Sequence, residues 1–118
     1  TEMQWRIMQQ KKPKDYVIAT GHAHSVKQFV NIAANYLGMK ILWSGKGLNE
    51  IGYTLNKNKK EILIKIDKKY FRPNEVEYLK GDASKALKDL KFKPKYTFKA
   101  LVEDMIDGDL SEAKKELK

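Results

Sequence analysis

The spacing of apolar residues predicts two helices in the N-terminal third of the chain. Apolar side chains recur at helical intervals over residues 1–10. Ser25 opens the sequence Ser-Val-Lys-Gln, a capping box in which the Ser hydroxyl and the Gln28 side chain satisfy backbone donors. The apolar residues that follow share one broad face, and Gly38 is suited to the left-handed position after a helix end. We therefore expect helices within 1–10 and 26–37.

Three further helical stretches are predicted in the C-terminal half. A short one follows Pro73, where the fixed backbone angle of proline favours a helix start. Asp82 can cap a helix that runs to about Leu90. Thr97 can cap the last helix, whose apolar stripe gives way to a charged tail from Asp107 onward.

Short runs of β-branched and apolar residues predict strands. Residues 16–20, Tyr-Val-Ile-Ala-Thr, are nearly all apolar, which is typical of a strand buried on both faces of a parallel sheet. Residues 41–43 and 61–67 predict two more strands, whereas the Gly, Asn and Lys content of residues 44–60 favours a loop. A doubly buried strand needs neighbours on both sides. We nevertheless expect 16–20 to be unpaired on at least one side or irregularly paired, which leaves an edge open to association.

The composition is that of a folded protein. The 118 residues suffice for one compact domain, and 42% apolar residues are too many for a disordered chain. No stretch approaches the roughly 20 apolar residues of a membrane helix, and no signal-peptide pattern opens the sequence, so we expect a cytoplasmic protein without membrane contact. With no Cys and two His, no metal site is expected. We predict an α/β fold and a single domain over 1–118, with short strands and four to five helices.

The formal net charge of +9 is open to two interpretations, because basic surfaces attract nucleic acids and also small phosphorylated ligands. Most of the excess comes from Lys, and Arg occurs only at Arg6 and Arg72. Since Arg is the usual residue for bidentate recognition of bases and phosphates, a Lys-rich surface is more typical of solvation. A basic module that binds nucleic acid or another polyanion stays open as an alternative function.

Motifs of oxidoreductase chemistry occur outside the context that they require. Tyr-x-x-x-Lys appears at residues 36–40 and 53–57, a spacing that is catalytic in short-chain dehydrogenases when it lies on one helix face. Gly38 interrupts the first copy, and the second lies in the predicted loop. Gly-x-Gly at residues 45–47 is similar to the start of a dinucleotide fingerprint, but no periodic helix follows it. We therefore assign no catalytic and no cofactor-binding residue in this chain.

Three segments carry a resemblance to a known family. Residues 66–86, IDKKYFRPNEVEYLKGDASKA, resemble the C-terminal region of GDP-mannose 4,6-dehydratases, which carries D-x-x-Y-x-R-P-x-E-V followed by G-D. Residues 15–30 look like the strand, turn and helix of that family, and residues 92–110 look like its last helix. The chain departs from the family at His22, where Glu is usual, and at Lys91, where Gly is usual. Nucleotide-sugar epimerases and dehydratases share a looser version of the pattern.

The resemblance implies the C-terminal, substrate-binding part of an extended short-chain dehydrogenase/reductase. In that family an N-terminal Rossmann half binds NADP and carries the catalytic Tyr and Lys, so this chain alone is expected to be inactive and to bind no cofactor. The implied reaction is a lyase reaction that converts GDP-mannose to GDP-4-keto-6-deoxymannose and water. The implied partners are GDP-mannose, the Rossmann half of the same enzyme and, for the intact enzyme, further copies in a homo-oligomer.

Two residues are carried over from the family as candidate substrate-binding residues. Arg72 matches the Arg that binds the diphosphate region of the nucleotide, and Glu75 matches the acidic residue that holds the ribose hydroxyls. The chemistry agrees, because a guanidinium fork suits phosphate oxygens and a carboxylate accepts hydroxyl donors. The alternative for Arg72 is a structural ion pair with a nearby carboxylate. A helical turn that begins at Pro73 would bring Arg72 and Glu75 to one face.

Two other classes of function compete with this one. A nucleic-acid-binding module would need aromatic residues interleaved with basic ones, whereas Trp5, Phe29 and Phe98 lie at helical positions typical of a core. Nucleic acid is therefore an unlikely partner on this interpretation. A pure interaction domain would explain the capped amphipathic helices but not the Arg-Pro-Asn-Glu-Val segment.

Overall fold

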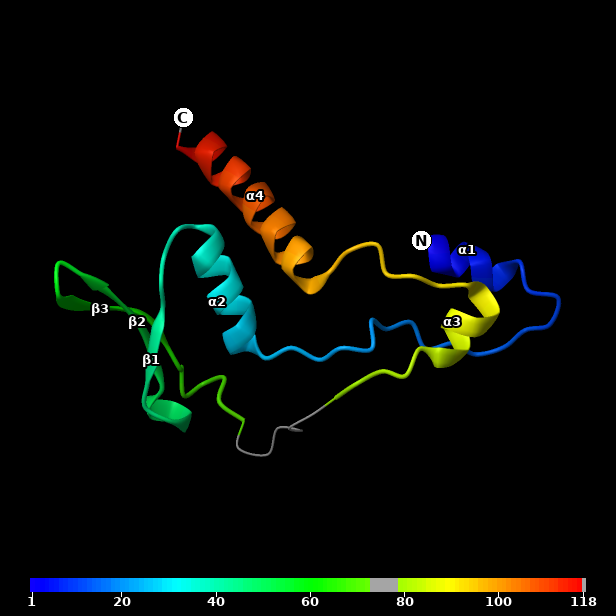
Figure 1. Cartoon of the computed structure of the whole chain (residues 1–118), viewed down its shortest axis with the longest axis horizontal. Coiled ribbons are helices and arrows are strands. Elements are labelled where there is room, and N and C mark those ends of the chain that lie inside the picture. Colours follow the sequence, from blue (N-terminus) through cyan, green and yellow to red (C-terminus); the bar gives the residue numbers. More distant parts are fainter. Residues whose placement is uncertain (73–78, 118) are drawn as a thin grey trace. The chain divides into compact units, whose positions relative to one another are not determined.

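The computed structural model describes residues 1–72 and 79–117, which form an α/β arrangement of helices and one antiparallel sheet (Figure 1). Four α-helices and three strands lie within these described residues. The chain divides into two compact units, which we call unit 1 (residues 1–24 and 79–97) and unit 2 (residues 25–72 and 98–117). The expectation of a single domain over 1–118 stays a prediction. The predicted helical stretch after Pro73 lies outside the described residues.

Unit 1 is built on two short helices, α1 (Glu2–Met8) and α3 (Ser84–Leu90), which pack against each other. The buried apolar side chains of unit 1 all belong to α3 or the residue before it: Ala83, Ala86 and Leu90. Trp5 on α1 is 61% exposed, so its predicted core position is wrong.

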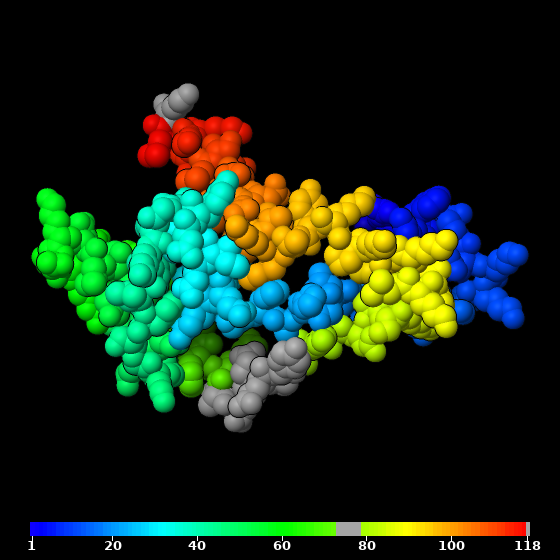
Figure 2. Space-filling view, in the orientation of Figure 1, coloured from blue at the N-terminus to red at the C-terminus, as the bar shows by residue number. Residues whose placement is uncertain are grey.

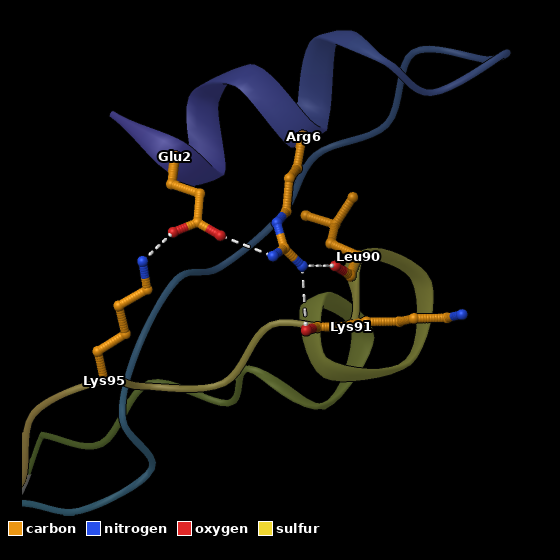
Figure 3. Close-up of polar contacts among 5 residues, drawn as sticks. All are labelled: Glu2, Arg6, Leu90, Lys91 and Lys95. Atoms are coloured by element: carbon orange, nitrogen blue, oxygen red, sulfur yellow. Dashed lines mark hydrogen bonds and ion pairs between the residues drawn. The ribbon is translucent and has the colours of Figure 1, made fainter.

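Arg6 fastens α1 to the end of α3 (Figure 3). Its guanidinium donates to the carbonyl oxygens of Leu90 at 2.8 Å and Lys91 at 3.2 Å, and to Glu2 Oε1 at 2.6 Å. Lys95 completes the cluster with an ion pair of 2.7 Å to Glu2 Oε2. These carbonyls belong to the last turn of a helix, where no backbone N–H is available to them. Arg6 therefore serves as a C-terminal cap supplied by another helix.

The expected strand at residues 16–20 is wrong as a regular strand. The segment belongs to no strand and has no ladder partner in the part of the chain that the structure describes. Val17 and Ile18 are 54% and 42% exposed, as expected for a doubly apolar segment without its sheet neighbours. Residues 79–81 pass close by, because a Cβ placed on Gly81 would lie 2.7 Å from the Ala19 Cβ. Only glycine permits this approach of two backbones.

The sheet of unit 2 has three antiparallel strands in chain order: β1 (Leu42–Ser44), β2 (Ile51–Asn56) and β3 (Lys59–Lys65). The prediction of a loop over 44–60 is wrong for β2, whose apolar residues alternate among the Gly, Asn and Thr residues that suggested a loop. Lys57 and Asn58 connect β2 to β3 with φ values of 48° and 63°. Two positive φ angles are the signature of the tight turn that suits the twist of a hairpin.

Two helices complete unit 2: α2 (Val26–Tyr36) and α4 (Phe98–Glu116). The capping box at Ser25 and Gln28 is confirmed, since each side chain bonds to the backbone N–H of the other residue. The predicted end is also confirmed, because Gly38 follows the C-cap residue with φ +74°. The last helix begins after Thr97 as expected, but it continues well past Asp107 through the charged tail. Glu and Lys are good helix formers, so the charged residues after Asp107 extend the helix and do not end it.

The two helices of unit 2 meet along the first half of α4. The rings of Phe29 and Phe98 lie 6.3 Å apart, Val102 is fully buried, and the Tyr36 hydroxyl donates to Asp107 at 2.9 Å. In the space-filling view the cyan surface of α2 meets the orange start of α4, whereas the red end of α4 extends past it (Figure 2). The packing of α2 therefore covers only part of the last helix.

Candidate functional site

Arg72 is described by the structure, and Glu75 is not. Arg72 lies in unit 2 beyond β3, outside any helix or strand, and its side chain is exposed. It forms no hydrogen bond or ion pair with another described residue, so no described carboxylate engages its guanidinium. Glu75 lies in the stretch 73–78, outside the described residues. The convergence of these two side chains on one nucleotide therefore stays a prediction.

The two Tyr-x-x-x-Lys spacings have other contacts in the structure. Tyr36 donates its hydroxyl to Asp107, a hydrogen bond that raises the pKa of the phenol. The ring of Tyr53 lies in β2 beneath the ammonium of Lys60, with 4.1 Å from Nζ to the ring centroid. Lys57 belongs to the hairpin turn. Neither spacing places a Lys beside a phenol on one helix face, which is what lowering the phenol pKa for catalysis would require.

The Gly-x-Gly sequence at 45–47 forms a tight turn and not a cofactor loop. Gly45 has φ +88°, and a Cβ placed on it would lie 2.1 Å from the Asn49 carbonyl oxygen. A three-residue 3-10 helix, Gly47–Asn49, follows, and then the chain enters β2. A dinucleotide fingerprint needs a full helix at this point, whose N-terminus faces the pyrophosphate. The residues present do not fit a dinucleotide site.

A polar cluster joins α2 to the sheet. The Lys27 ammonium pairs with Glu50 Oε1 at 2.5 Å and lies 4.9 Å from the centre of the Trp43 ring. The Trp43 indole N–H donates to Asn31 Oδ1 at 2.8 Å. Each charged or polar group in this cluster has a partner within the chain, so its role is to fix α2 on the sheet.

A pocket of about 430 Å³ lies in unit 1, where residues 19–21 and the start of α3 come together. The prediction of site residues from the sequence missed it, because the two segments that form it are about sixty positions apart and only the fold brings them together. Its lining combines small, apolar and polar residues: Ala19, Thr20, Gly21, Lys80, Gly81, Asp82, Ala83, Ser84, Leu87 and Pro94. Two sequence signals were available, Gly21 after the apolar segment 16–20 and the pair Gly81-Asp82 in the segment that resembles the family.

Asp82 is ionised in this pocket. Its Oδ1 accepts hydrogen bonds from the Ser84 hydroxyl at 2.5 Å and the Ser84 backbone N–H at 2.9 Å. These bonds lower the pKa of the carboxyl group. The prediction that Asp82 caps this helix is wrong, because Ala83 is the N-cap residue and the helix starts at Ser84. Asp82 lies one residue earlier and bonds to Ser84, the first residue of the helix. The same carboxylate therefore orders the start of α3 and faces the pocket.

Among the described residues, no group of three or more His, Cys, Asp or Glu side chains is placed to hold a metal ion. No described helix has the length and apolar character needed to span a bilayer.

Comparison with known proteins places these features in one family. The sequence model of the family GDP-mannose 4,6 dehydratase matches residues 1–105 of the chain. The chain belongs to the GDP-mannose 4,6-dehydratase family. The dehydratases of Drosophila melanogaster and Homo sapiens are 45% and 40% identical to it, each over 92% of the chain. GDP-mannose 4,6 dehydratase 1 of Arabidopsis thaliana is 43% identical over 98% of the chain.

The chain spans only part of the length of these dehydratases. The matched region is 27% of the fly enzyme, 29% of the human enzyme and 27% of the Arabidopsis enzyme. The chain therefore corresponds to a portion of a GDP-mannose 4,6-dehydratase, as the resemblance implied.

Proposed function

We propose that the chain is the nucleotide-sugar-binding part of a GDP-mannose 4,6-dehydratase. The observation that carries this proposal is the match of residues 1–105 to the family. The relatives bear the name of this enzyme, and the matched region is only 27–29% of their length. The substrate is GDP-mannose, and the reaction is the loss of water that gives GDP-4-keto-6-deoxymannose. The chain alone supplies binding and not chemistry.

Catalysis and cofactor binding belong to another part of the enzyme in this proposal. The turn at 45–47 and the contacts of Tyr36 and Tyr53 support this division, because none of them offers a cofactor loop or an activated phenol. NADP would be held by a Rossmann half that lies outside these 118 residues. The intact enzyme would be a cytoplasmic homo-oligomer.

Arg72 and Glu75 are the residues proposed to hold the nucleotide. The exposed guanidinium of Arg72 has no carboxylate partner among the described residues, so none of these carboxylates competes with phosphate oxygens for its donors. Glu75 would accept hydrogen bonds from the two ribose hydroxyls, as a carboxylate with two acceptor oxygens can do. The two interactions differ in kind, because only the first pairs opposite charges.

The test of the Arg72 assignment is GDP-mannose affinity in the full-length enzyme. Arg72→Ala should cost about 2–5 kcal/mol of binding free energy, because the bound nucleotide would bury the pair of guanidinium and phosphate and the variant removes one partner. Lys68→Ala is the matched control, since Lys68 is an exposed cation close by in the chain. Titration calorimetry at low and high salt measures the affinities. Binding of Arg72→Ala as tight as that of the parent at low salt would overturn the assignment.

Glu75→Ala should have a smaller effect, about 1–3 kcal/mol, because it removes hydrogen bonds and no counter-charge. GDP and a GDP analogue that lacks the ribose hydroxyls separate the two roles. The loss caused by Glu75→Ala should appear with GDP and vanish with the analogue. An equal loss with both ligands would show that Glu75 does not contact the ribose.

A further inference from the structure

The pocket of unit 1 has no part in the proposed contacts of Arg72 and Glu75. Its volume of about 430 Å³ lies within the range of sites that bind small molecules. Its residues come from two segments about sixty positions apart in the sequence, at 19–21 and 80–84. Their close approach at Gly81 and Ala19 fixes one wall of the pocket.

The lining offers donors and acceptors of both charges. Lys80 brings an ammonium with three N–H donors, and its side chain has no hydrogen bond or ion pair with another described residue. Asp82 uses only Oδ1 for its bonds to Ser84, so Oδ2 stays available as an acceptor. Thr20 adds a hydroxyl, whose contact with the His22 carbonyl oxygen is long at 3.4 Å.

This combination of charges selects the class of ligand. An anion would be attracted by Lys80 but repelled by the ionised Asp82. An organic cation would be attracted by Asp82 but repelled by Lys80. A neutral molecule with several hydroxyl groups can donate to the carboxylate and accept from the ammonium at the same time. The apolar side chains of Ala19, Leu87 and Pro94 supply a wall for its C–H face.

We propose that this pocket binds a neutral, hydroxyl-rich small molecule of the sugar or polyol class. The choice of mannose as the probe rests on the proposed function, whereas the class of ligand rests on the pocket alone. The pocket lies wholly within unit 1, so it can be tested without reference to Arg72 in unit 2.

The experiment is a titration of the isotope-labelled chain, followed by the backbone amide signals in NMR spectra. D-mannose should shift the amides of Gly21, Gly81 and Ser84 in a saturable manner, and inorganic phosphate should leave them in place. The proposal is overturned if mannose gives no saturable shift, or if phosphate shifts the same amides, which would indicate an anion site.

Two variants assign the effect to the lining. Asp82→Asn keeps a side-chain oxygen for the bonds to Ser84 but removes the charge, and Lys80→Met removes the ammonium while keeping the side-chain length. Each should weaken mannose binding about fivefold or more, as the loss of one hydrogen bond to a charged group predicts. Lys93→Met is the control outside the lining and should bind like the parent. Parent-like binding by Asp82→Asn and Lys80→Met would overturn the proposal, and unchanged circular dichroism spectra would show that the variants fold.

A parallel titration with GDP separates this inference from the proposed function. GDP should shift the amide of Arg72 and not those of Gly21 and Gly81. If GDP binds and mannose does not, the pocket assignment fails while the nucleotide assignment stands. If mannose binds and GDP does not, the nucleotide assignment fails while the pocket assignment stands.

Discussion

Lys91 occupies a backbone conformation that its side chain disfavours. It ends α3 in the left-handed region, with φ 51° and ψ 39°. Lys91→Gly should therefore stabilise the chain by about 1 kcal/mol, because it removes the contact of Cβ with the following carbonyl oxygen. Urea denaturation of the parent, Lys91→Gly and the control Lys93→Gly checks this. The control should be neutral or destabilising, and a less stable Lys91→Gly would contradict the argument.

Glu2 makes the attachment of α1 dependent on pH. Its hydrogen bond with Lys95, and then its bond with Arg6, lower the pKa of the carboxyl group below its ordinary value. A lowered folded-state pKa means that the stabilisation is complete above the unfolded-state value, about 4.3, and is lost as pH falls through the folded-state value.

The expected result is a smaller acid-induced loss of stability in Glu2→Gln than in the parent between roughly pH 5 and pH 3. Denaturation midpoints measured across that range provide the comparison. Asp104→Asn is the control, because it removes an exposed carboxylate of α4 that has no ion pair in the described part of the chain. Its stability should fall with decreasing pH as steeply as that of the parent. If the stability of Glu2→Gln fell with decreasing pH as steeply as that of the parent, this account would be contradicted.

At the level of single residues, the sequence predicted what depends on near neighbours. The capping box of Ser25 and Gln28 and the left-handed Gly38 were identified because each depends only on residues within one helical turn. The cap that Arg6 provides could not be predicted, since its acceptors are 84 and 85 residues away. The pocket was missed for the same reason.

Among the elements, α4 is covered along only part of its length. Val102 and Phe98 pack against α2, but α2 ends at Tyr36, whose hydroxyl reaches Asp107. Beyond that point Leu110 and Leu117 remain 39% and 88% exposed. A helix segment of fewer than about 12 residues is marginal in water without packing.

The second half of α4 should therefore exchange its amide hydrogens much faster than the first half. Hydrogen exchange measured by NMR should show protection over residues 99–107 and little protection over 110–116. Uniform protection along the helix would mean that something else covers its end, such as a second copy of the chain. Val102→Ala should remove the protection of the first half, because it leaves a cavity at the fully buried position.

The sequence predicted helices better than strands, for a physical reason. The helices have local caps and a stripe of apolar residues, both of which can be identified within a short window. β2 was missed because its Gly, Thr and Asn positions lie among apolar ones, and only pairing with β1 and β3 makes them a strand. At residues 16–20 the opposite error occurred, because a sequence suited to a sheet interior has no described sheet neighbour.

The whole molecule has little interior for its length. Five apolar side chains are buried among the described residues: Ala34, Ala83, Ala86, Leu90 and Val102. Many larger apolar residues are exposed, including Trp5, Met8 and Val17. Apolar surface of this extent is typical of a part that packs against other protein.

The isolated chain should self-associate as its concentration rises. Segment 16–20 has no strand partner among the described residues and exposes apolar side chains, which is the condition for edge-to-edge association. Sedimentation velocity should show larger species for the parent than for a Val17→Thr, Ile18→Thr double variant. A parent that stays monomeric at all concentrations would contradict this expectation.

The isolated chain should also have no dehydratase activity with NADP and GDP-mannose, because the described residues offer no cofactor loop and no activated phenol. Product formation followed by chromatography checks this, with a full-length relative as the positive control. Turnover above background by the pure chain would overturn the proposal that catalysis and cofactor binding belong to another part of the enzyme.

The bond between Arg6 and the end of α3 also sets an order of events during synthesis. Arg6 leaves the ribosome 84 residues before Leu90, its acceptor. At about 5–20 residues per second, the wait is on the order of 4–17 s. A helix as short as α1 does not persist alone over that time, because helix nucleation is unfavourable in water. Unit 2 lies between the two halves of unit 1 in the sequence, so its sheet and α2 emerge during this interval. Helix α1 is therefore translated before α3 but becomes fixed only after α3 has been made.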